Sequence, residues 1–166
     1  MGDRVGCTLE VWGVTTQKHF RDICVFLDNE FGGGVDDLFE ELSDGSMYLE
    51  EIEGGDLPRN VEDVLKAAGL GYCWGWGSGA EFQSGYTVYD PHAKETYTNL
   101  TVGLDVHIPL HKAADEIYVK RAHDAVTLRA KGYDTPLIVA QTSHEYVEAI
   151  ANQSDETVKE VNPNGL

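Results

Sequence analysis

Basic residues are scarce in this sequence. Only 12 Lys and Arg accompany 29 Asp and Glu, which leaves a formal net charge of −17 at pH 7. Proteins bind nucleic acids largely through Lys and Arg side chains that neutralise phosphates. A chain so poor in cations lacks that means of binding, so we expect no direct contact with nucleic acid. A strongly negative surface is instead attracted to basic partners.

Long apolar runs and paired cysteines are also missing. No segment approaches the roughly 20 apolar residues that span a bilayer, and the N-terminal stretch MGDRVGCTLE has no apolar segment of the signal-peptide type. The three cysteines, Cys7, Cys24 and Cys73, are far apart and show no CxxC spacing. These absences predict no membrane association, reduced thiols and a cytoplasmic location, which is the host cytosol if a phage encodes the protein.

The remaining composition is that of a folded protein. Hydrophobic residues make up 42% of the 166-residue chain, which is enough to build one core without disulfides or metals. We predict a single α+β domain over residues 1–153, followed by a frayed polar tail over residues 154–166. The domain is expected to have a mainly antiparallel sheet, with a meander at about residues 70–110, packed with four to five helices.

Periodicity in the sequence gives the expected elements. Apolar residues at Phe20, Ile23, Cys24 and Leu27 fall on one stripe of a helix, and the three glycines at 32–34 end it. The same reading predicts helices over 17–31, 35–43, 58–68, 112–131 and 142–153. Alternation, or a short apolar run, predicts strands over 7–12, 46–53, 70–77, 82–88, 96–110 and 136–140.

The stretch LGYCWGWGSG at residues 70–79 invites three interpretations. A phosphate-binding loop lies between a strand and the start of a helix, whereas a second strand follows this one. A platform for stacking nucleobases needs a positive groove, and Lys94 is the only base in residues 67–111. We therefore interpret Tyr72, Trp74 and Trp76 as the core side of a hairpin, with the glycines and Cys73 on its other side.

Catalytic and metal-binding patterns are weak. No Ser lies in a GxSxG motif and no Cys lies in a recognisable catalytic context. His107 and His111, with Asp105 nearby, are candidate metal ligands, but Pro109 lies between the two histidines and they need not converge. The prediction is a protein that is not an enzyme and that carries no cofactor. A small enzyme or metal-binding protein using His107 and His111 remains an alternative.

Negative charge is concentrated in one part of the chain. Residues 22–63 contain fourteen acidic residues and one basic residue, Arg59. Concentrated like charge costs folding free energy, and simple solvation is the competing explanation. We expect this segment to contact a partner through carboxylates and two apolar anchors: Asp36, Asp37, Glu40, Glu41, Asp44, Glu50, Glu51, Glu53, Phe31 and Tyr48.

These observations favour a non-enzymatic inhibitor whose carboxylates stand in for nucleic-acid phosphates in the groove of a basic nucleic-acid-binding protein or complex. In charge and size, the chain resembles small acidic anti-defence proteins of phages and plasmids, such as anti-CRISPR or anti-restriction inhibitors. The alternative is an immunity protein that neutralises a basic toxin or nuclease, which would use the same acidic surface. Composition leaves the oligomeric state open.

Overall fold

The computed structural model describes residues 4–53, 56–80 and 82–161, and there the chain folds as one α+β domain. The strands in these ranges form an open, mainly antiparallel sheet: β1 (Arg4–Thr16), β2 (Ser46–Glu53), β3 (Gly71–Trp76), β4 (Gly85–Asp90), β5 (Glu95–Val102), β6 (Asp105–His107) and β7 (Leu137–Ala140). The α-helices are α1 (Gln17–Phe31), α2 (Val35–Ser43), α3 (Arg59–Ala67), α4 (Glu116–Asp134) and α5 (Ser143–Val161). The predicted fold class is confirmed.

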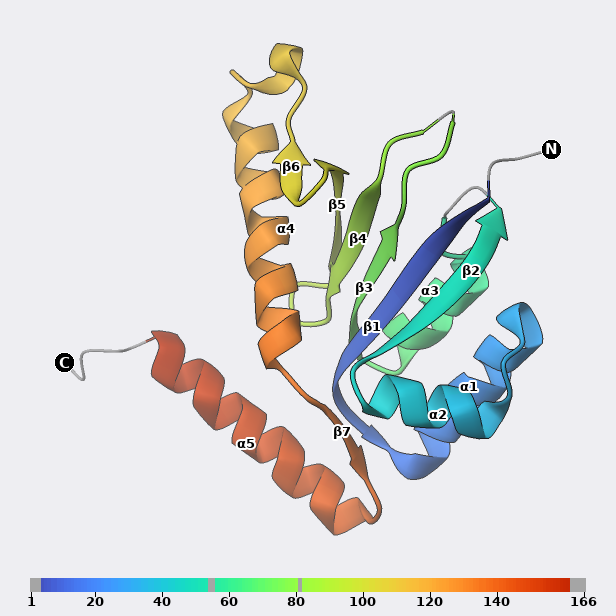
Figure 1. Ribbon diagram of the computed structural model, residues 1–166. Coiled ribbons are helices and arrows are strands. Elements are labelled where there is room, and N and C mark those ends of the chain that lie inside the picture. The colour runs from blue at the N-terminus through green and yellow to red at the C-terminus, as the bar shows by residue number, and fades with distance from the viewer. Residues whose placement is uncertain (1–3, 54–55, 81, 162–166) are drawn as a thin grey trace.

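The sheet has the order β2-β1-β3-β4-β5-β6, and β7 pairs in parallel with the last residues of β1. Strands β3 to β6 form an antiparallel meander, as predicted for residues 70–110. Helices lie on both sides of the sheet: α1, α2 and α3 cover one side and α4 lies on the other (Figure 1). We call these sides the α1–α3 face and the α4 face.

Strand β1 supplies residues to both faces because successive side chains of a strand point to opposite sides. Cys7, Leu9 and Val11 are buried in the larger core on the α1–α3 face. Trp12 belongs to a smaller cluster on the α4 face, and Glu10 lies on that face too. The strand is longer than the predicted 7–12, since its start pairs with β2 and its end with β7.

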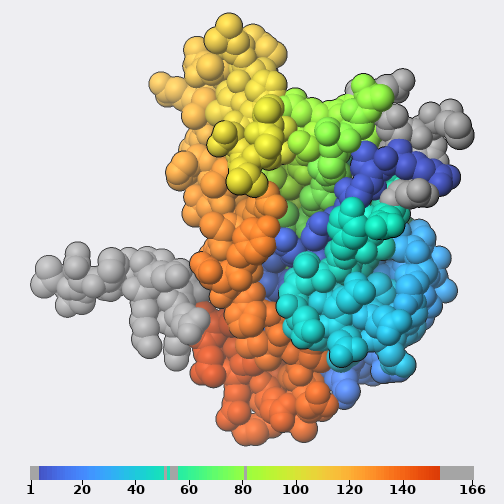
Figure 2. Space-filling view, viewed as in Figure 1, coloured from blue at the N-terminus to red at the C-terminus, as the bar shows by residue number. Residues whose placement is uncertain are grey.

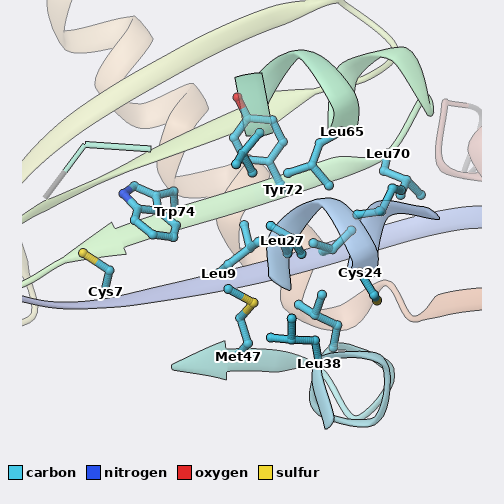
Figure 3. Close-up of a cluster of buried hydrophobic side chains, with 14 of the residues drawn as sticks. Cys7, Leu9, Cys24, Leu27, Leu38, Met47, Leu65, Leu70, Tyr72 and Trp74 are labelled. Carbon is cyan, nitrogen blue, oxygen red and sulfur yellow. The ribbon is translucent and has the colours of Figure 1, made fainter. Parts of the chain in front are cut away.

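The core of the α1–α3 face is continuous and apolar. Thr16 caps α1 by accepting a hydrogen bond from the His19 backbone N–H at 3.3 Å. The predicted stripe is buried against the sheet: Phe20, Ile23, Cys24 and Leu27. Leu38 and Leu42 of α2 and Leu65 of α3 complete the layer (Figure 3).

The aromatic strand β3 forms the centre of this core, as its alternation predicted. Tyr72 and Trp74 are almost fully buried on the α1–α3 face. Cys73 lies on the α4 face, where it packs with Tyr86 and Val88. The stretch at residues 70–76 is therefore a structural strand.

Trp12 fills the lower part of the α4 face between two glycines. A Cβ atom on Gly71 of β3 or on Gly132 of α4 would overlap the Trp12 ring. Glycine at both positions lets the indole lie between the sheet and the helix. At Gly71 the absence of a side chain on β3 therefore allows the close approach of the Trp12 ring.

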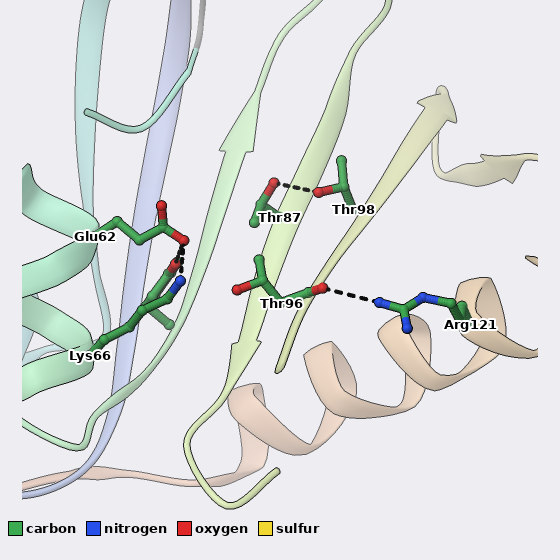
Figure 4. Close-up of polar contacts among 7 residues, drawn as sticks. Glu62, Lys66, Thr87, Thr96, Thr98 and Arg121 are labelled. Atoms are coloured by element: carbon green, nitrogen blue, oxygen red, sulfur yellow. Dashed lines mark hydrogen bonds and ion pairs between the residues drawn. The ribbon is translucent and has the colours of Figure 1, made fainter. Parts of the chain in front are cut away.

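Polar contacts connect strands and helices at the edge of each face (Figure 4). Glu62 of α3 accepts hydrogen bonds from Lys66 and from the Tyr72 hydroxyl, the latter at 2.8 Å. Burial acts to raise the pKa of Glu62, but these hydrogen bonds outweigh it and the pKa lies below its ordinary value. On the α4 face, Arg121 donates to the backbone oxygen of Thr96 at 3.4 Å.

Two sequence predictions for residues 96–119 are wrong. Residues 96–110 do not form one strand, because the backbone turns at Gly103, where φ is +61°, and returns as β6. Leu104 is fully exposed at this turn rather than alternating into a core. Helix α4 begins after the cap residue Asp115 rather than at Lys112, and Ile117 in its first turn is 74% exposed.

Helix α5 follows β7 and begins with the predicted capping box. The Glu145 carboxylate accepts from the backbone N–H of Gln141 and of Thr142, and the Thr142 hydroxyl accepts from the Glu145 N–H. The helix continues to Val161, beyond the predicted end near Gln153. Residues 162–166 of the predicted tail lie outside the described residues. No α-helix within residues 4–53, 56–80 and 82–161 is long and apolar enough to cross a membrane.

Candidate functional site: the acidic face of helix α2

Helix α2 gathers five of the predicted contact residues on one surface. At 100° per residue, the carboxylates at 36, 37, 40, 41 and 44 fall within an arc of about 140°, and the buried Leu38 and Leu42 fall on the opposite side. Each of the five acidic residues is exposed. We call this surface the α2 acidic face, and it consists of Asp36, Asp37, Glu40, Glu41 and Asp44.

A glycine linker fixes the start of α2 against the end of α1. Gly32, Gly33 and Gly34 all have positive φ angles, a conformation that glycine adopts without strain. The Asp28 carboxylate accepts a hydrogen bond from the Gly34 backbone N–H at 2.8 Å. This bond holds the linker in a defined conformation, so the orientation of the acidic face relative to α1 is set.

The charges of this face are largely uncompensated within the part of the chain that is described. Asp36 forms an exposed ion pair with Arg21 at 2.8 Å. Asp37, Glu40, Glu41 and Asp44 have no ion pair or side-chain hydrogen bond within residues 4–53, 56–80 and 82–161. The last turn of α2 contains no basic residue. The face is therefore an exposed row of carboxylates, and α2 lies at the molecular surface (Figure 2).

Phe31, predicted as an apolar anchor, contributes to the core instead. Its ring is half-buried and stacks on Trp74 with the ring centroids 6.0 Å apart. Most of its surface serves folding, because it closes the end of α1 over the central aromatic strand. Among the predicted contact residues whose side chains are described, Phe31 is the one that is half-buried rather than exposed.

Tyr48 lies on the other side of the sheet from α2. Tyr48 pairs with Thr8, whose neighbours Cys7 and Leu9 point into the α1–α3 core, so Tyr48 points to the α4 face. It is 61% exposed and its hydroxyl lies over Gly6. Glu50 is exposed as well. The side chains of Glu51 and Glu53 lie outside the described part of the structure.

Other acidic residues of the 22–63 segment serve the fold. Glu30 accepts a hydrogen bond from the Asn60 amide at 2.6 Å, which joins the end of α1 to the start of α3. Asp28 holds the glycine linker, and Glu62 binds Lys66 and Tyr72. Of the fourteen acidic residues in this segment, three thus serve the fold and five form the α2 acidic face, while Asp22, Glu50, Asp56 and Asp63 are exposed elsewhere on the described surface.

The residues considered for metal binding or covalent chemistry do not form a site in the described ranges. No three His, Cys, Asp or Glu side chains described in the structure are placed to hold a metal ion. The His107 imidazole hydrogen-bonds the Gln83 amide, and His111 is exposed in the short 3₁₀ turn at Leu110–Lys112. Burial raises the pKa of the Cys73 thiol to about 12, so this thiol remains protonated at neutral pH and is a poor nucleophile.

The structure also contains a hollow that the sequence analysis missed. It lies on the α4 face, where Gly6, Gly75 and Gly77 leave the sheet without side chains and Arg129 of α4 forms a wall. The available signal was the spacing of Gly71, Cys73, Gly75 and Gly77 along one side of a strand.

No protein-family model, curated protein or solved structure matches this chain. Its function therefore has to be argued from the geometry and electrostatics of its own surfaces.

Proposed function

We propose that this protein is a non-enzymatic inhibitor that binds the basic groove of a nucleic-acid-binding protein through its α2 acidic face. The carboxylates of this face take the place of backbone phosphates. Partner Lys and Arg that normally neutralise phosphates would pair with them. An inhibitor of anti-CRISPR or anti-restriction type works in this way, because it occupies the groove that the nucleic acid needs.

The spacing of the charges supports this proposal. Residues 36 to 44 span about 12 Å along the helix axis, at 1.5 Å per residue. Five carboxylates over this length give roughly one charge every 3 Å. A single strand of B-DNA carries one phosphate about every 3.4 Å along the axis. The α2 acidic face therefore resembles a short stretch of one strand in linear charge density.

The proposal rests mainly on one observation: carboxylates of the α2 acidic face lower the stability of the helix that presents them. Glu40, Glu41 and Asp44 lie at the C-terminal end of α2, where the helix dipole disfavours negative charge. Asp36 and Glu40, and likewise Asp37 and Glu41, are like-charged neighbours one turn apart, which destabilise a helix by about 0.2–0.5 kcal/mol per pair. Asp36 and Asp37 lie in the first turn, where the dipole favours negative charge. Glu40, Glu41 and Asp44 have no such benefit and no partner among the described residues, so a role in binding explains these three better.

A charge-neutral variant tests the proposal. The change is Asp37→Asn, Glu40→Gln, Glu41→Gln and Asp44→Asn, and it leaves the Arg21–Asp36 pair intact. The tagged wild-type protein should capture a nucleic-acid-binding protein from lysate of the source cell or its host. Capture should weaken as salt is raised, and duplex DNA should displace the captured protein. The variant should lose at least about 100-fold in affinity, since each charged pair in an interface is worth about 1 kcal/mol or more.

A matched control removes four charges from other surfaces. Asp105→Asn, Glu116→Gln, Asp134→Asn and Glu148→Gln change the net charge by the same amount on exposed residues outside α2. This control should bind as the wild type does. Equal capture by the wild type and the α2 variant, or capture that duplex DNA leaves unchanged, would contradict the proposal.

A further inference from the structure

The α4 face of the sheet is only partly covered. Helix α4 packs against β5 and over the lower parts of β3 and β4. Above this contact lies a hollow of about 340 Å³ between β1, β3, β4, the β5–β6 turn and α4. Its size is within the range of small-molecule sites, which runs from about 300 to 1,000 Å³. In Figure 2, strand β1 reaches the surface between α4 and β2.

The floor of the hollow is bare backbone. Gly75 lies between Thr8 and Tyr86 in the sheet register, and all three residues face α4. A Cβ added to Gly75 would come no closer than 4.0 Å to any other group, namely the carbonyl oxygen of Gly85. The space above Gly75 is therefore open, in contrast to the space above Gly71, which Trp12 fills. A bare floor of this kind lets a flat molecule lie directly against the strands.

An arginine is held in place at the wall of the hollow. The Arg129 guanidinium lies over the Tyr86 ring, 4.4 Å from its centroid, and donates to the Tyr133 hydroxyl at 3.0 Å. Its Nε is buried and has no hydrogen-bond partner within the described ranges. Stacking and the single hydrogen bond fix the plane of the group and leave most of its five N–H donors available.

A carboxylate lies beside this arginine. Glu10 lines the same hollow as Arg129 and Tyr133, and burial raises the pKa of its carboxyl while Tyr133 and Arg129 act to lower it. The hollow is thus lined by one cation, one carboxylate and the hydroxyls of Ser84 and Thr101, which hydrogen-bond to each other at 3.0 Å. A ligand that balances these groups is uncharged overall, and it carries hydrogen-bond acceptors for Arg129 next to donors for Glu10.

We propose that this hollow binds a planar, uncharged heterocycle of the guanine type, as a nucleoside or free base. Guanine offers O6 and N7 as adjacent acceptors, which Arg contacts with two hydrogen bonds. Its N1–H and amino group are adjacent donors that a carboxylate accepts. The flat ring lies on the backbone at Gly75, and the ribose lies toward the rim of the hollow at Ser84 and Thr101.

The net charge of the protein favours an unphosphorylated ligand over a phosphorylated one. A net charge of −17 repels phosphates, and the hollow has one guanidinium that is already beside a carboxylate. Guanosine should therefore bind more tightly than its 5′-monophosphate. Adenosine and cytidine lack the pairing of acceptors and donors that suits Arg129 and Glu10. This site is on the opposite side of the sheet from α2 and does not depend on the function proposed for the α2 acidic face.

Calorimetric titration of the full chain tests the inference with guanosine, guanosine 5′-monophosphate, adenosine and cytidine as probes. Guanosine should bind at one site per chain, about tenfold or more tightly than each of the other three. Gly75→Val places a side chain in the open space and should reduce guanosine affinity at least about tenfold. Thermal unfolding of this variant should stay close to that of the wild type, because valine suits a strand and its Cβ comes no closer than 4.0 Å to the Gly85 carbonyl oxygen.

Two further variants separate effects on guanosine binding from effects on folding. Thr98→Val introduces the same side chain on the other face of the sheet, where Thr98 bonds Thr87 at 3.0 Å (Figure 4), and it should leave guanosine affinity unchanged. Arg129→Lys keeps the charge but loses the planar donors, and it should weaken guanosine binding about tenfold. The absence of saturable guanosine binding at about 1 mM, equal affinity for the four probes, or full binding by Gly75→Val would each overturn the inference.

Discussion

Over β1, β2 and β3, the α1–α3 face of the sheet is closed by a continuous layer of apolar side chains, whereas the α4 face is covered only in part. On the first face, α1, α2 and α3 bury Leu9, Tyr72 and Trp74 almost completely. On the second, α4 covers Trp12 and Tyr86 but leaves the glycine floor open. The same strands supply both faces. The difference therefore comes from the residues of β1 and β3 that alternate with the core residues and point to the α4 face.

This comparison separates stability from binding. The closed face contains most of the buried apolar area, which is the main source of folding free energy. The open face carries polar groups and bare backbone that contribute little to folding. The α2 acidic face is built on the outer side of the helices that close the first face, so it is presented by the most stable part of the molecule.

The largest expected effect is on the closed face. Trp74→Ala removes an almost fully buried indole that stacks on Phe31. We expect a loss of about 3–5 kcal/mol in the free energy of unfolding, because a large cavity is left in a packed core. Urea unfolding followed by circular dichroism measures this loss. A loss below about 1 kcal/mol would show that the layer is less closed than the structure indicates.

Gly71 and Gly75 of β3 both face α4, and alanine at these two positions should change stability in opposite directions. Gly71→Ala forces a methyl group into the Trp12 ring and should cost about 1–3 kcal/mol through overpacking. Gly75→Ala adds the same methyl group over open space and should stabilise the strand by about 0.5–1 kcal/mol. Thermal unfolding of the two variants measures the difference. Equal effects would mean that the hollow is filled in solution.

Two carboxylates on opposite faces should respond to pH with opposite sign. Glu62 has a lowered pKa, so it stabilises the fold above its unfolded pKa, and this contribution is lost as the pH falls through the folded value. Glu62→Gln should therefore cost about 1 kcal/mol at neutral pH and nothing in acid. Burial raises the pKa of Glu10, so its stabilising contribution is present in acid and lost as the pH rises. Glu10→Gln should be more stable than the wild type at neutral pH.

Unfolding midpoints of these two variants over pH 3–8 check the signs. The two curves should approach the wild type at low pH and separate from it in opposite directions near neutrality. Curves that move in the same direction would contradict the assignment of opposite environments.

The smallest expected effect concerns the α2 acidic face. Glu40→Gln combined with Glu41→Gln removes two negative charges from the C-terminal end of α2. We expect a gain of about 0.3–1 kcal/mol in stability, because the unfavourable interaction with the helix dipole is relieved. Thermal unfolding at low salt measures the gain, which should shrink at high salt. A loss of stability would show that these carboxylates support the fold.

Most of the fold could be predicted because its elements have clean periodicity. The apolar stripe of α1, the alternation at Tyr72 and Trp74 and the capping box at Glu145 each identify an element from local residues. Residues 104–110 also alternate, but Gly103 turns the chain, and alternation by itself does not distinguish a core residue from the exposed Leu104. The order of strands in the sheet depends on long-range pairing that local patterns do not contain.

The candidate site was predictable only as a charge concentration. Spacing within α2 was sufficient to place Asp37, Glu40 and Glu41 on one side of that helix. The sequence could not show that Phe31 stacks on Trp74, or that Tyr48 points to the opposite side of the sheet. These placements depend on how α1 and β2 meet the sheet, which is a property of the assembled core.

Strand β1 has three neighbours, β2, β3 and β7, and it supplies alternate residues to both faces. Deleting one residue after Cys7 would exchange inward and outward positions along the rest of the strand. Leucine and valine would then line the hollow, and Glu10 would enter the apolar layer. The pairing shift at Gly6 ends before this point and would not absorb the change. We therefore expect β1 to accept single substitutions far more readily than a change of length.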